Sequence, residues 1–299
     1  MKIQPIAAHV HRISLGFVNA YAITTPEKDW VLVDSGMKNN LAALKSLEDH
    51  FGRAPFAILL THGHLDHVGN ASELATHWNI KIYAHRLEKP YLVGKAMFPP
   101  QDPTVGGALA QASRLMPHTM FNLTGQLELF GADGLVPFLP DWKFIETPGH
   151  SPGHVSFWHE ADRVLIAGDA LATANFDSPL GMMTHKPSQF ARSGSPFNFD
   201  WEKTKVSVGK LADLEPVVVG AGHGEPICGA ETPQQLRDFS HNFRAPNQGR
   251  YVEKPALTDE NGVIFLPPKP KDNFGRNLGT IVGAATALTL GAKLFSRRK

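Results

Sequence analysis

The sequence is poor in two features that often reveal what a protein does. It contains a single cysteine, Cys228, among 299 residues, which excludes an intramolecular disulfide framework and any zinc site built from two or more thiolates. Lysine and arginine (29) nearly equal aspartate and glutamate (28), so the net charge is only +1 and no overall basic field indicates a nucleic-acid partner. If a metal is bound, imidazole and carboxylate groups must hold it.

The chain also lacks a recognisable signal peptide at its start. The first 21 residues carry two basic residues and two histidines and contain no continuous apolar region. We therefore expect a cytoplasmic protein.

The C-terminal tail, residues 277–299, is apolar and then basic. Residues 277–292 are 16 uncharged positions, and four basic residues lie between 293 and 299. This stretch is shorter than the ~20 apolar residues that a membrane-spanning helix needs, which favours a weak helix lying on the domain or extending from it. The alternative is association with a membrane through this tail.

The apolar residues of the rest of the chain follow strand-like and helix-like spacings in turn. In the first half, strands are predicted at 9–14, 18–24, 30–34, 56–60 and 81–84, and helices at 41–51 and 71–78. In the second half, strands are predicted at 142–146, 155–158, 164–167 and 216–220, and helical stretches within 191–214 and at 232–243. This order is typical of the α/β class.

Composition suggests where the domain begins and ends. We expect one domain over residues 1–244, interrupted at about 90–124 by a loop-and-helix insertion rich in proline and glycine. A long irregular segment inside a compact domain is often a lid or a binding loop. A Pro-rich, charged extension follows at 245–276, before the tail at 277–299.

Histidine is abundant, with 15 residues, and the densest group is His62-Gly-His64-Leu-Asp66-His67, directly after the predicted strand 56–60. Residues two apart in a turning segment point the same way, so His62 and His64 can share one metal ion. Asp66 and His67 then project to a second position. Nitrogen and oxygen donors of this kind suit Zn²⁺, with Mn and Fe as the chemical alternatives. The simpler interpretation is a solvated histidine-rich turn.

Three further ligand-type residues also follow predicted strands. His150 lies in a glycine-flanked turn, Asp169 ends the strand at 164–167, and His223 ends the strand at 216–220. Each is a weak signal alone, but strand ends at one edge of a sheet are where active sites of α/β proteins assemble. Together the four loops predict a metal centre and argue against the solvated turn.

At this point a family resemblance is visible, carried by an ordered set of residues: His62, His64, Asp66, His67, His150, Asp169 and His223. The set resembles the metallo-β-lactamase-fold hydrolase superfamily over roughly residues 8–230, and its spacing is similar to the glyoxalase II-like branch that includes the N-acyl homoserine lactonases. The resemblance implies a four-layer αβ/βα sandwich with the metal site at the edge between two mixed sheets.

The resemblance also implies how two divalent ions, expected to be Zn²⁺, would be held. One ion takes His62, His64 and His150. The other takes Asp66, His67 and His223, and Asp169 bridges the two. The Asp34-Ser-Gly turn resembles the loop that lies under the site in this superfamily as structural support.

Two ions held in this way imply a hydrolase acting on a small molecule. A metal-bridging hydroxide would attack an electrophilic carbonyl or phosphorus, with Asp66 orienting the nucleophile or passing its proton to the leaving group. No serine or cysteine nucleophile is required, so we expect cleavage of an ester, lactone or thioester. One alternative is a phosphodiesterase or nuclease of the same fold, against which the near-zero net charge counts. Another is a mononuclear-iron persulfide oxygenase, against which the complete second ligand set counts.

The sequence departs from this branch in two places. Lactonases of the branch place a tyrosine between the bridging aspartate and the last histidine, whereas this chain has none between 169 and 223. His185 lies in the corresponding stretch and is a candidate substitute, or a loop histidine with no role. Glyoxalase II adds a larger C-terminal helical domain with basic residues for glutathione, and here only 232–244 is clearly helical.

Other residues are candidates for contacts with the substrate. An apolar pocket could be lined by residues of the insertion and one later pair, with core packing as the alternative: Met97, Phe98, Met116, Met120, Phe121, Met182 and Met183. Candidates to hold an anionic group, or else solvated surface charges, are Lys95, Arg114, Lys186 and Arg192. His154 could support the metal site from behind, or it is a structural turn residue.

Overall fold

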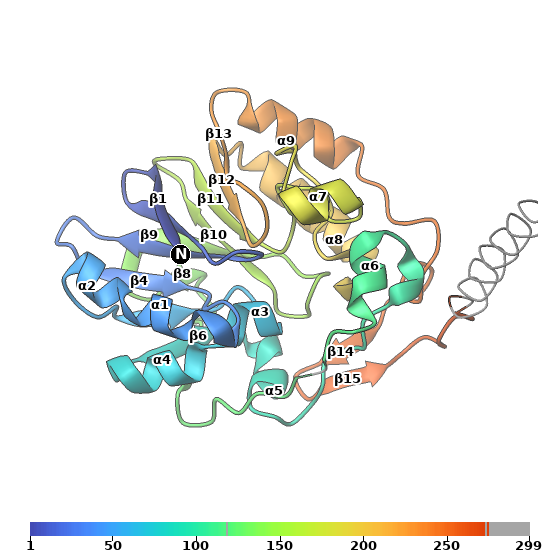
Figure 1. Cartoon of the computed structure of the whole chain (residues 1–299), viewed down its shortest axis with the longest axis horizontal. Helices are drawn as coiled ribbons and strands as arrows, with labels where there is room; N and C mark the ends of the chain where they lie inside the picture. Colours follow the sequence, from blue (N-terminus) through green and yellow to red (C-terminus); the bar gives the residue numbers. More distant parts are fainter. Residues whose placement is uncertain (118, 273, 275–299) are drawn as a thin grey trace, which may run out of the picture. The chain divides into compact units, whose positions relative to one another are not determined.

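The computed structural model describes residues 1–117, 119–272 and 274 of the chain. The chain divides into two compact units, residues 1–267 and 268–299, and the fold given below is that of the first (Figure 1). The apolar and basic tail at 277–299 lies outside the described residues. In the part of the chain that is described, no helix has the length and apolar character needed to cross a membrane.

The first sheet has seven strands, which follow one another in sequence order. They are β1 (Lys2–Ala7), β2 (Val10–Ser14), β3 (Asn19–Thr24), β4 (Trp30–Val33), β5 (Ala57–Leu59), β6 (Lys81–Ala84) and β7 (Leu127–Leu129). Neighbours from β1 to β4 run antiparallel, and neighbours from β4 to β7 run parallel. The strands predicted at 9–14 and 18–24 are therefore confirmed as β2 and β3, which form an antiparallel hairpin.

The second sheet has six strands in the order β13-β12-β11-β10-β9-β8. They are β8 (Leu135–Val136), β9 (Leu139–Glu146), β10 (Val155–His159), β11 (Val164–Gly168), β12 (Val218–Ala221) and β13 (Ile227–Cys228). β11 and β12 run parallel, whereas the other neighbours run antiparallel. Because parallel neighbours end at the same edge, the loops after β11 and β12 leave the sheet side by side.

Helices lie outside both sheets in this unit (Figure 1). The α-helices are α1 (Leu41–Lys45), α2 (Leu47–Phe51), α3 (Leu65–Val68), α4 (Ala71–Trp78), α5 (Lys89–Leu92), α6 (Ala108–Ser113), α7 (Pro179–Thr184), α8 (Trp201–Asp213) and α9 (Thr232–His241). Short 3-10 turns are η1 (Lys38–Asn40), η2 (Arg86–Glu88), η3 (Pro103–Val105) and η4 (Ser195–Phe197). The single helix predicted at 41–51 is divided at Ser46 into α1 and α2.

Side chains along the central strands point alternately to the two faces of the sheet, so the core forms in separate layers. In β4, Leu32 packs in the cluster that includes Leu44 and Leu74 from the helices, while Val31 and Val33 pack in a second cluster with residues of β9, β10 and β11. This period of two places one face of the strand against helices and the other against the second sheet. A third cluster joins the second sheet to α8 and α9. The result is the four-layer αβ/βα sandwich that the family resemblance implies.

The insertion at 90–124 connects β6 to β7 through α5, η3 and α6. Its apolar residues divide between the core, where Leu92 and Leu123 are buried, and the pocket described below. The extension after residue 244 also belongs to the compact unit, which reaches Pro267.

The extension packs against the insertion and against the segment that precedes α8. The ring of Tyr251 is 1% exposed and its hydroxyl donates to the Pro100 carbonyl at 2.7 Å. The Ala256 N–H donates to the Phe199 carbonyl at 3.0 Å. A two-stranded sheet, β14 (Leu257–Asp259) and β15 (Gly262–Phe265), follows. Proline content and charge do not reveal these contacts, because they are made with residues distant in the sequence.

Candidate metal centre

The loop after β5 brings four ligand-type side chains to the edge of the first sheet. β5 ends at Leu59, and His64 has an extended backbone (φ −75°, ψ 155°) directly before α3. The chain therefore presents His62 and His64 from an extended segment and then turns into a helix, which redirects Asp66 and His67.

Three loops of the second sheet supply the remaining side chains. His150 lies between β9 and β10, Asp169 directly follows β11, and His223 follows β12. The ligand-bearing loops of the two sheets lie at one shared edge. The structure therefore brings together all seven residues that the sequence singles out.

The first group of donors is formed by His62, His64 and His150. The Nδ1 atom of His64 lies 3.1 Å from Nε2 of His62 and 2.9 Å from Nε2 of His150. Three imidazole nitrogens that converge in this way could hold one metal ion. Burial lowers the pKa of all three rings, that of His64 to about 4, and the neutral imidazole that results is the form that binds metal.

The second group is formed by Asp66, His67 and His223. The Oδ2 atom of Asp66 lies 3.3 Å from Nε2 of His223 and 3.9 Å from Nε2 of His67. Although burial opposes ionisation of Asp66, the two histidines lower the pKa of its carboxyl, which stays charged. One carboxylate and two imidazoles therefore face a second position that could hold a metal ion.

Asp169 lies between the two groups. Its Oδ2 atom is 3.4 Å from Nε2 of His150 in the first group and 3.3 Å from Nε2 of His223 in the second. Its Oδ1 atom is 3.6 Å from Nε2 of His67. Burial acts against its charge, but the neighbouring histidines lower the pKa of the carboxyl.

Unsatisfied polar atoms test whether this cluster fits a metal. Both Nε2 of His67 and Oδ1 of Asp169 are buried and have no hydrogen-bond partner among the described residues. Leaving such atoms unpaired costs on the order of 1–3 kcal/mol each. A divalent cation between them would satisfy both, so the donor set fits the group that the sequence predicts.

Asp34 supports this cluster from the end of β4, as the Asp34-Ser-Gly turn predicts. Its Oδ2 atom lies 2.7 Å from Nδ1 of His67 and accepts a hydrogen bond from the Thr61 hydroxyl at 2.8 Å. Its Oδ1 atom accepts from the Thr61 N–H at 2.9 Å. A carboxylate on the far nitrogen fixes the orientation of a ligand imidazole, so Asp34 directs the Nε2 atom of His67 toward the centre.

His154 supports the cluster from the other side. Its ring is fully buried, and its Nε2 atom accepts a hydrogen bond from the Asp169 N–H at 2.8 Å. Its Nδ1 atom lies 2.8 Å from the Thr147 hydroxyl. Burial lowers the pKa of His154 to about 3, so the ring is neutral and can accept that hydrogen bond.

Sequence reasoning missed Glu88, which joins two ligand-bearing loops. The side chain is fully buried at the end of η2. Its Oε2 atom accepts from the Gly63 N–H at 2.8 Å, and its Oε1 atom accepts from the Ser151 hydroxyl at 2.8 Å and the Gly153 N–H at 2.6 Å. Gly63 lies between His62 and His64, and Ser151 follows His150. No sequence spacing marks Glu88, because its partners are mainly backbone groups of distant segments.

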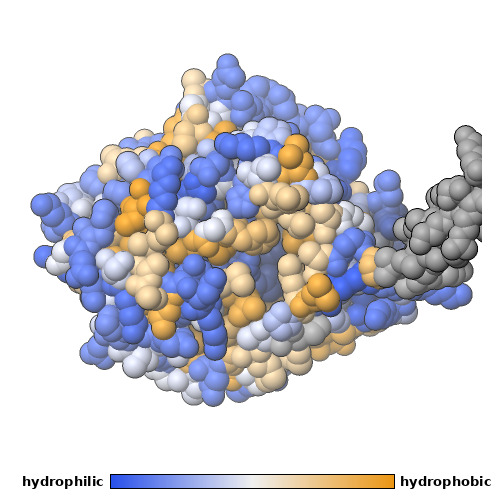
Figure 2. All heavy atoms as spheres, viewed as in Figure 1, coloured by the Kyte–Doolittle hydropathy of each residue, from blue (hydrophilic) through white to orange (hydrophobic). Residues whose placement is uncertain are grey.

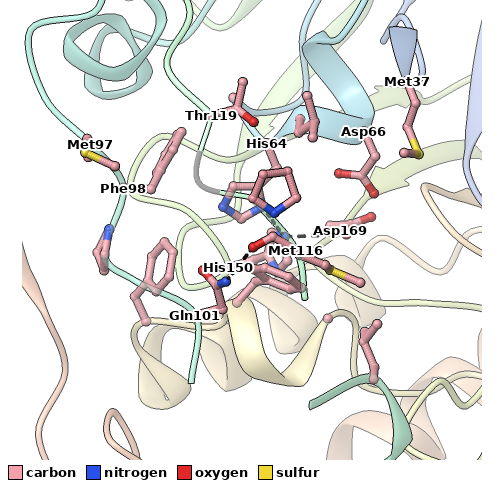
Figure 3. Close-up of a pocket in the computed structure, with 18 of the residues that line it drawn as sticks. Met37, His64, Asp66, Met97, Phe98, Gln101, Met116, Thr119, His150 and Asp169 are labelled. Atoms are coloured by element: carbon pink, nitrogen blue, oxygen red, sulfur yellow. Dashed lines mark hydrogen bonds and ion pairs between the residues drawn. The ribbon is translucent and has the colours of Figure 1, made fainter. Parts of the chain in front are cut away.

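A pocket of about 210 Å³ opens directly over the donors. Met97 and Phe98 lie on one side of His64, with Asp66 and Met37 on the other (Figure 3). Of the pocket residues predicted from the insertion, four line it: Met97, Phe98, Met116 and Phe121. Apolar residues also form much of the surface at the centre of this face (Figure 2).

Other predicted substrate contacts do not reach this pocket. Met120, which is 58% exposed, and the pair Met182 and Met183 are not among its described lining residues. His185 instead contacts the rings of Phe17 and Phe176, with centroids 6.1 Å and 5.3 Å away. The structure thus gives no support to His185 as a substitute for a lactonase-type tyrosine.

The four cations suggested as anion-binding residues are also absent from the described lining of the pocket: Lys95, Arg114, Lys186 and Arg192. The Arg192 guanidinium donates to the Asp177 carboxylate at 2.8 Å and to the Arg244 carbonyl at 3.2 Å. These contacts hold it on a different part of the surface.

A four-layer sandwich with histidine and aspartate clusters at the edge between its sheets defines a class of metal-dependent hydrolases. The chain belongs to the metallo-beta-lactamase superfamily, whose family model matches residues 13–223.

Individual relatives agree with this assignment. The chain is 35% identical over 245 residues to the probable metallo-hydrolase YflN of Bacillus subtilis, a match that covers 79% of this chain and 92% of the relative. It is 31% identical over 169 residues to the hydroxyacylglutathione hydrolase GloC of Haemophilus influenzae, a match that covers 56% of this chain and 68% of the relative. Among solved structures, the B3 metallo-beta-lactamase BLEG-1 is 26% identical with a TM-score of 0.55, covering 77% of this chain and 96% of that one.

Proposed function

We propose that this protein is a binuclear metallohydrolase that cleaves an ester, lactone or thioester of a small molecule. The observation that carries the proposal is the pair of complete donor groups on either side of Asp169. The similarity to a hydroxyacylglutathione hydrolase supports the carbonyl substrate class. The donor types favour Zn²⁺, with Mn and Fe as alternatives.

When bound, two divalent ions would bring the pKa of water toward neutrality and stabilise negative charge that develops on the substrate. Asp169 would hold the two positions at a fixed separation, because its Oδ2 atom contacts a histidine of each group. Asp34 would keep Nε2 of His67 aimed inward.

Asp66 is the residue that we assign to proton transfer. Its side chain lines the pocket and is 27% exposed. An aspartate carboxyl is ordinarily ionised at neutral pH, so it can accept a proton there. Asp66 takes a proton from water as the oxygen adds to the carbonyl carbon, and returns it to the leaving oxygen or sulfur as that bond breaks. The products are an acid and an alcohol or thiol.

The test is metal analysis of the purified protein, followed by a panel of lactones, esters, thioesters and phosphodiesters on the same sample. We expect about two metal ions per chain and cleavage of carbonyl substrates. Hydrolysis of phosphodiesters alone would favour the phosphodiesterase or nuclease alternative. A single iron with persulfide oxidation would favour the oxygenase, and the second donor group weighs against it.

The Asp169→Asn substitution tests the shared carboxylate. Because Oδ2 contacts both groups, the variant should lose metal from both positions and lose activity by two or more orders of magnitude. Asp141→Asn, an exposed position in β9, is the matched control and should retain both. Metal loss from one position only would contradict the bridging role.

A further inference from the structure

We propose that the substrate is an uncharged molecule with a flexible apolar chain, and that this chain lies against the phenylalanine wall beside His64. The phenylalanine wall consists of Phe98, Phe197 and Phe199. The inference rests on the proposed hydrolytic function and names the class of substrate that the same site would select.

The phenylalanine wall is built directly onto the first donor group. The ring centroids of Phe98, Phe197 and Phe199 lie 4.9 Å, 5.7 Å and 5.9 Å from that of His64. All three line the pocket. A carbonyl group placed over the donors would therefore have an apolar surface within one side-chain length, on which an attached chain can be buried.

The wall is held rigidly from behind. Tyr91 stacks on Phe98 with ring centroids 4.0 Å apart, and Tyr251 packs edge-on against Phe199 at 5.7 Å. Both tyrosines are nearly fully buried. The rings thus form a preformed surface, so little ordering is needed when a chain binds.

Methionines supply adaptable contacts toward the opening of the pocket. Met37 and Met97 are 38% and 48% exposed, and both line it. Unbranched thioether side chains adjust to ligands of different shape and length. Their position is easily seen in Figure 3, where Met97 and Met37 lie on opposite sides of His64. This combination of fixed rings and flexible methionines suits an alkyl chain of variable length.

Apart from the donors, the described lining of the pocket has two polar side chains, those of Gln101 and Thr119, and neither is charged. Gln101 donates its side-chain N–H groups to the Ser113 and Met116 carbonyls, each at 3.1 Å. Apart from the histidine and aspartate donors, the described lining residues carry no charge. An anionic group on the chain would lose its water against the phenylalanine wall without a compensating partner.

A matched series of p-nitrophenyl esters tests both chain length and charge on the protein with its metal bound. We expect kcat/KM to rise at least about tenfold from acetate to octanoate, mainly through KM, which requires burial of about two of the six added methylenes at a threefold to fourfold gain each. The monoester of suberic acid has the same acyl length as octanoate but ends in a carboxylate. It should be cleaved roughly tenfold or more less efficiently than octanoate.

Placing a cation in the pocket should reverse this preference in part. Met97→Lys should raise kcat/KM for the suberate ester relative to octanoate by roughly tenfold. Met183→Lys adds the same charge at a position that is 81% exposed and outside the described pocket lining, and it should leave the ratio as in the unaltered protein. Equal responses of the two variants would contradict the assignment of this wall.

A binding experiment separates this inference from the proposed function. Methyl hexyl ketone, which cannot be hydrolysed, and its analogue with a terminal carboxylate are titrated into the metal-loaded protein by calorimetry. The ketone should bind roughly tenfold or more tighter. Ester cleavage with no preference for length or charge would overturn the inference and leave the function standing. Preference for the ketone without cleavage of any ester, lactone or thioester would overturn the function and support the inference.

Discussion

At the scale of single residues, the site depends on side chains that hold other side chains in place. The seven donor-type residues could be predicted from the sequence because their types and their positions after strands are visible there. Glu88 could not, since its role comes from three hydrogen bonds to the loops that carry His62, His64 and His150. Such contacts form only after β6 and the two loops are assembled.

Glu88→Gln should therefore weaken metal binding without removing a donor. The amide keeps the shape of the side chain but replaces one acceptor oxygen by a donor, so one of the two loops loses its hydrogen bonds. We expect affinity for the metal to fall about tenfold, measured by competition with a chelator. Glu253→Gln, an exposed position, is the control. Equal affinity in the two variants would show that Glu88 does not position the loops.

The same substitution should also change how stability depends on pH. Burial raises the pKa of Glu88 from 4.5 to about 7 in the folded chain, although its three hydrogen bonds oppose the shift. Between these values the folded protein keeps a proton that the unfolded chain has released. The stabilising contribution of Glu88 is thus fully present below the lower value and is lost as pH rises through the higher one.

Glutamine does not titrate, so Glu88→Gln should lose this part of the pH dependence. From acid to neutral pH, the difference in free energy of unfolding should shift in favour of the variant by up to about 3 kcal/mol. Urea unfolding of chelator-treated protein at several pH values measures it. A constant difference across this range would contradict the raised pKa.

At the scale of elements, the buried central strands could be predicted, and the edges of the sheets could not. β4, β5, β10, β11 and β12 are short apolar runs whose burial is evident in the sequence. β7 and β8 contain three and two residues, and β7 is largely exposed. Strands this short have no hydrophobic period of their own, because pairing with a neighbour defines them.

The turn after β12 shows how tightly an element must approach the donors. A Cβ atom at Gly222 would lie 2.1 Å from Oδ1 of Asp169 and 2.8 Å from Cε1 of His67. Gly222→Ala should therefore displace both donors, with loss of bound metal and a fall in activity of at least about tenfold. Metal analysis and turnover measure these effects.

Gly209→Ala in α8 is the control, since the nearest atom to its Cβ is Oγ of Ser240 at 3.8 Å. An alanine within a helix should raise the free energy of unfolding by roughly 0.5–1 kcal/mol and leave the metal content unchanged. If both variants retained full metal and activity, the close approach at Gly222 would be without consequence.

At the scale of the whole molecule, the compact unit includes the segment after the last helix. A chain that ends after Pro267 should unfold at nearly the same temperature as the full chain. A chain that ends after Arg244 loses Tyr251, whose ring is buried and whose hydroxyl binds the Pro100 carbonyl. It should lose about 3 kcal/mol or more of stability. Thermal unfolding compares the two, and equal midpoints would place the end of the domain near 244.

The chain that ends after Pro267 also tests the role of the tail at 277–299. If the tail anchors the protein, the full chain should sediment with membranes, and the chain ending after Pro267 should be released from them with unchanged hydrolysis. Recovery of the full chain in the soluble fraction would dispose of the anchor.

Each donor group draws on both halves of the sandwich. His62, His64, Asp66 and His67 precede the exposed loop at 131–133, and His150, Asp169 and His223 follow it. A chain divided at that loop leaves two fragments, neither of which contains a complete donor group. Association of the two fragments would therefore depend on bound metal, because each ion would act as a cross-link between two polypeptides that share the inner core.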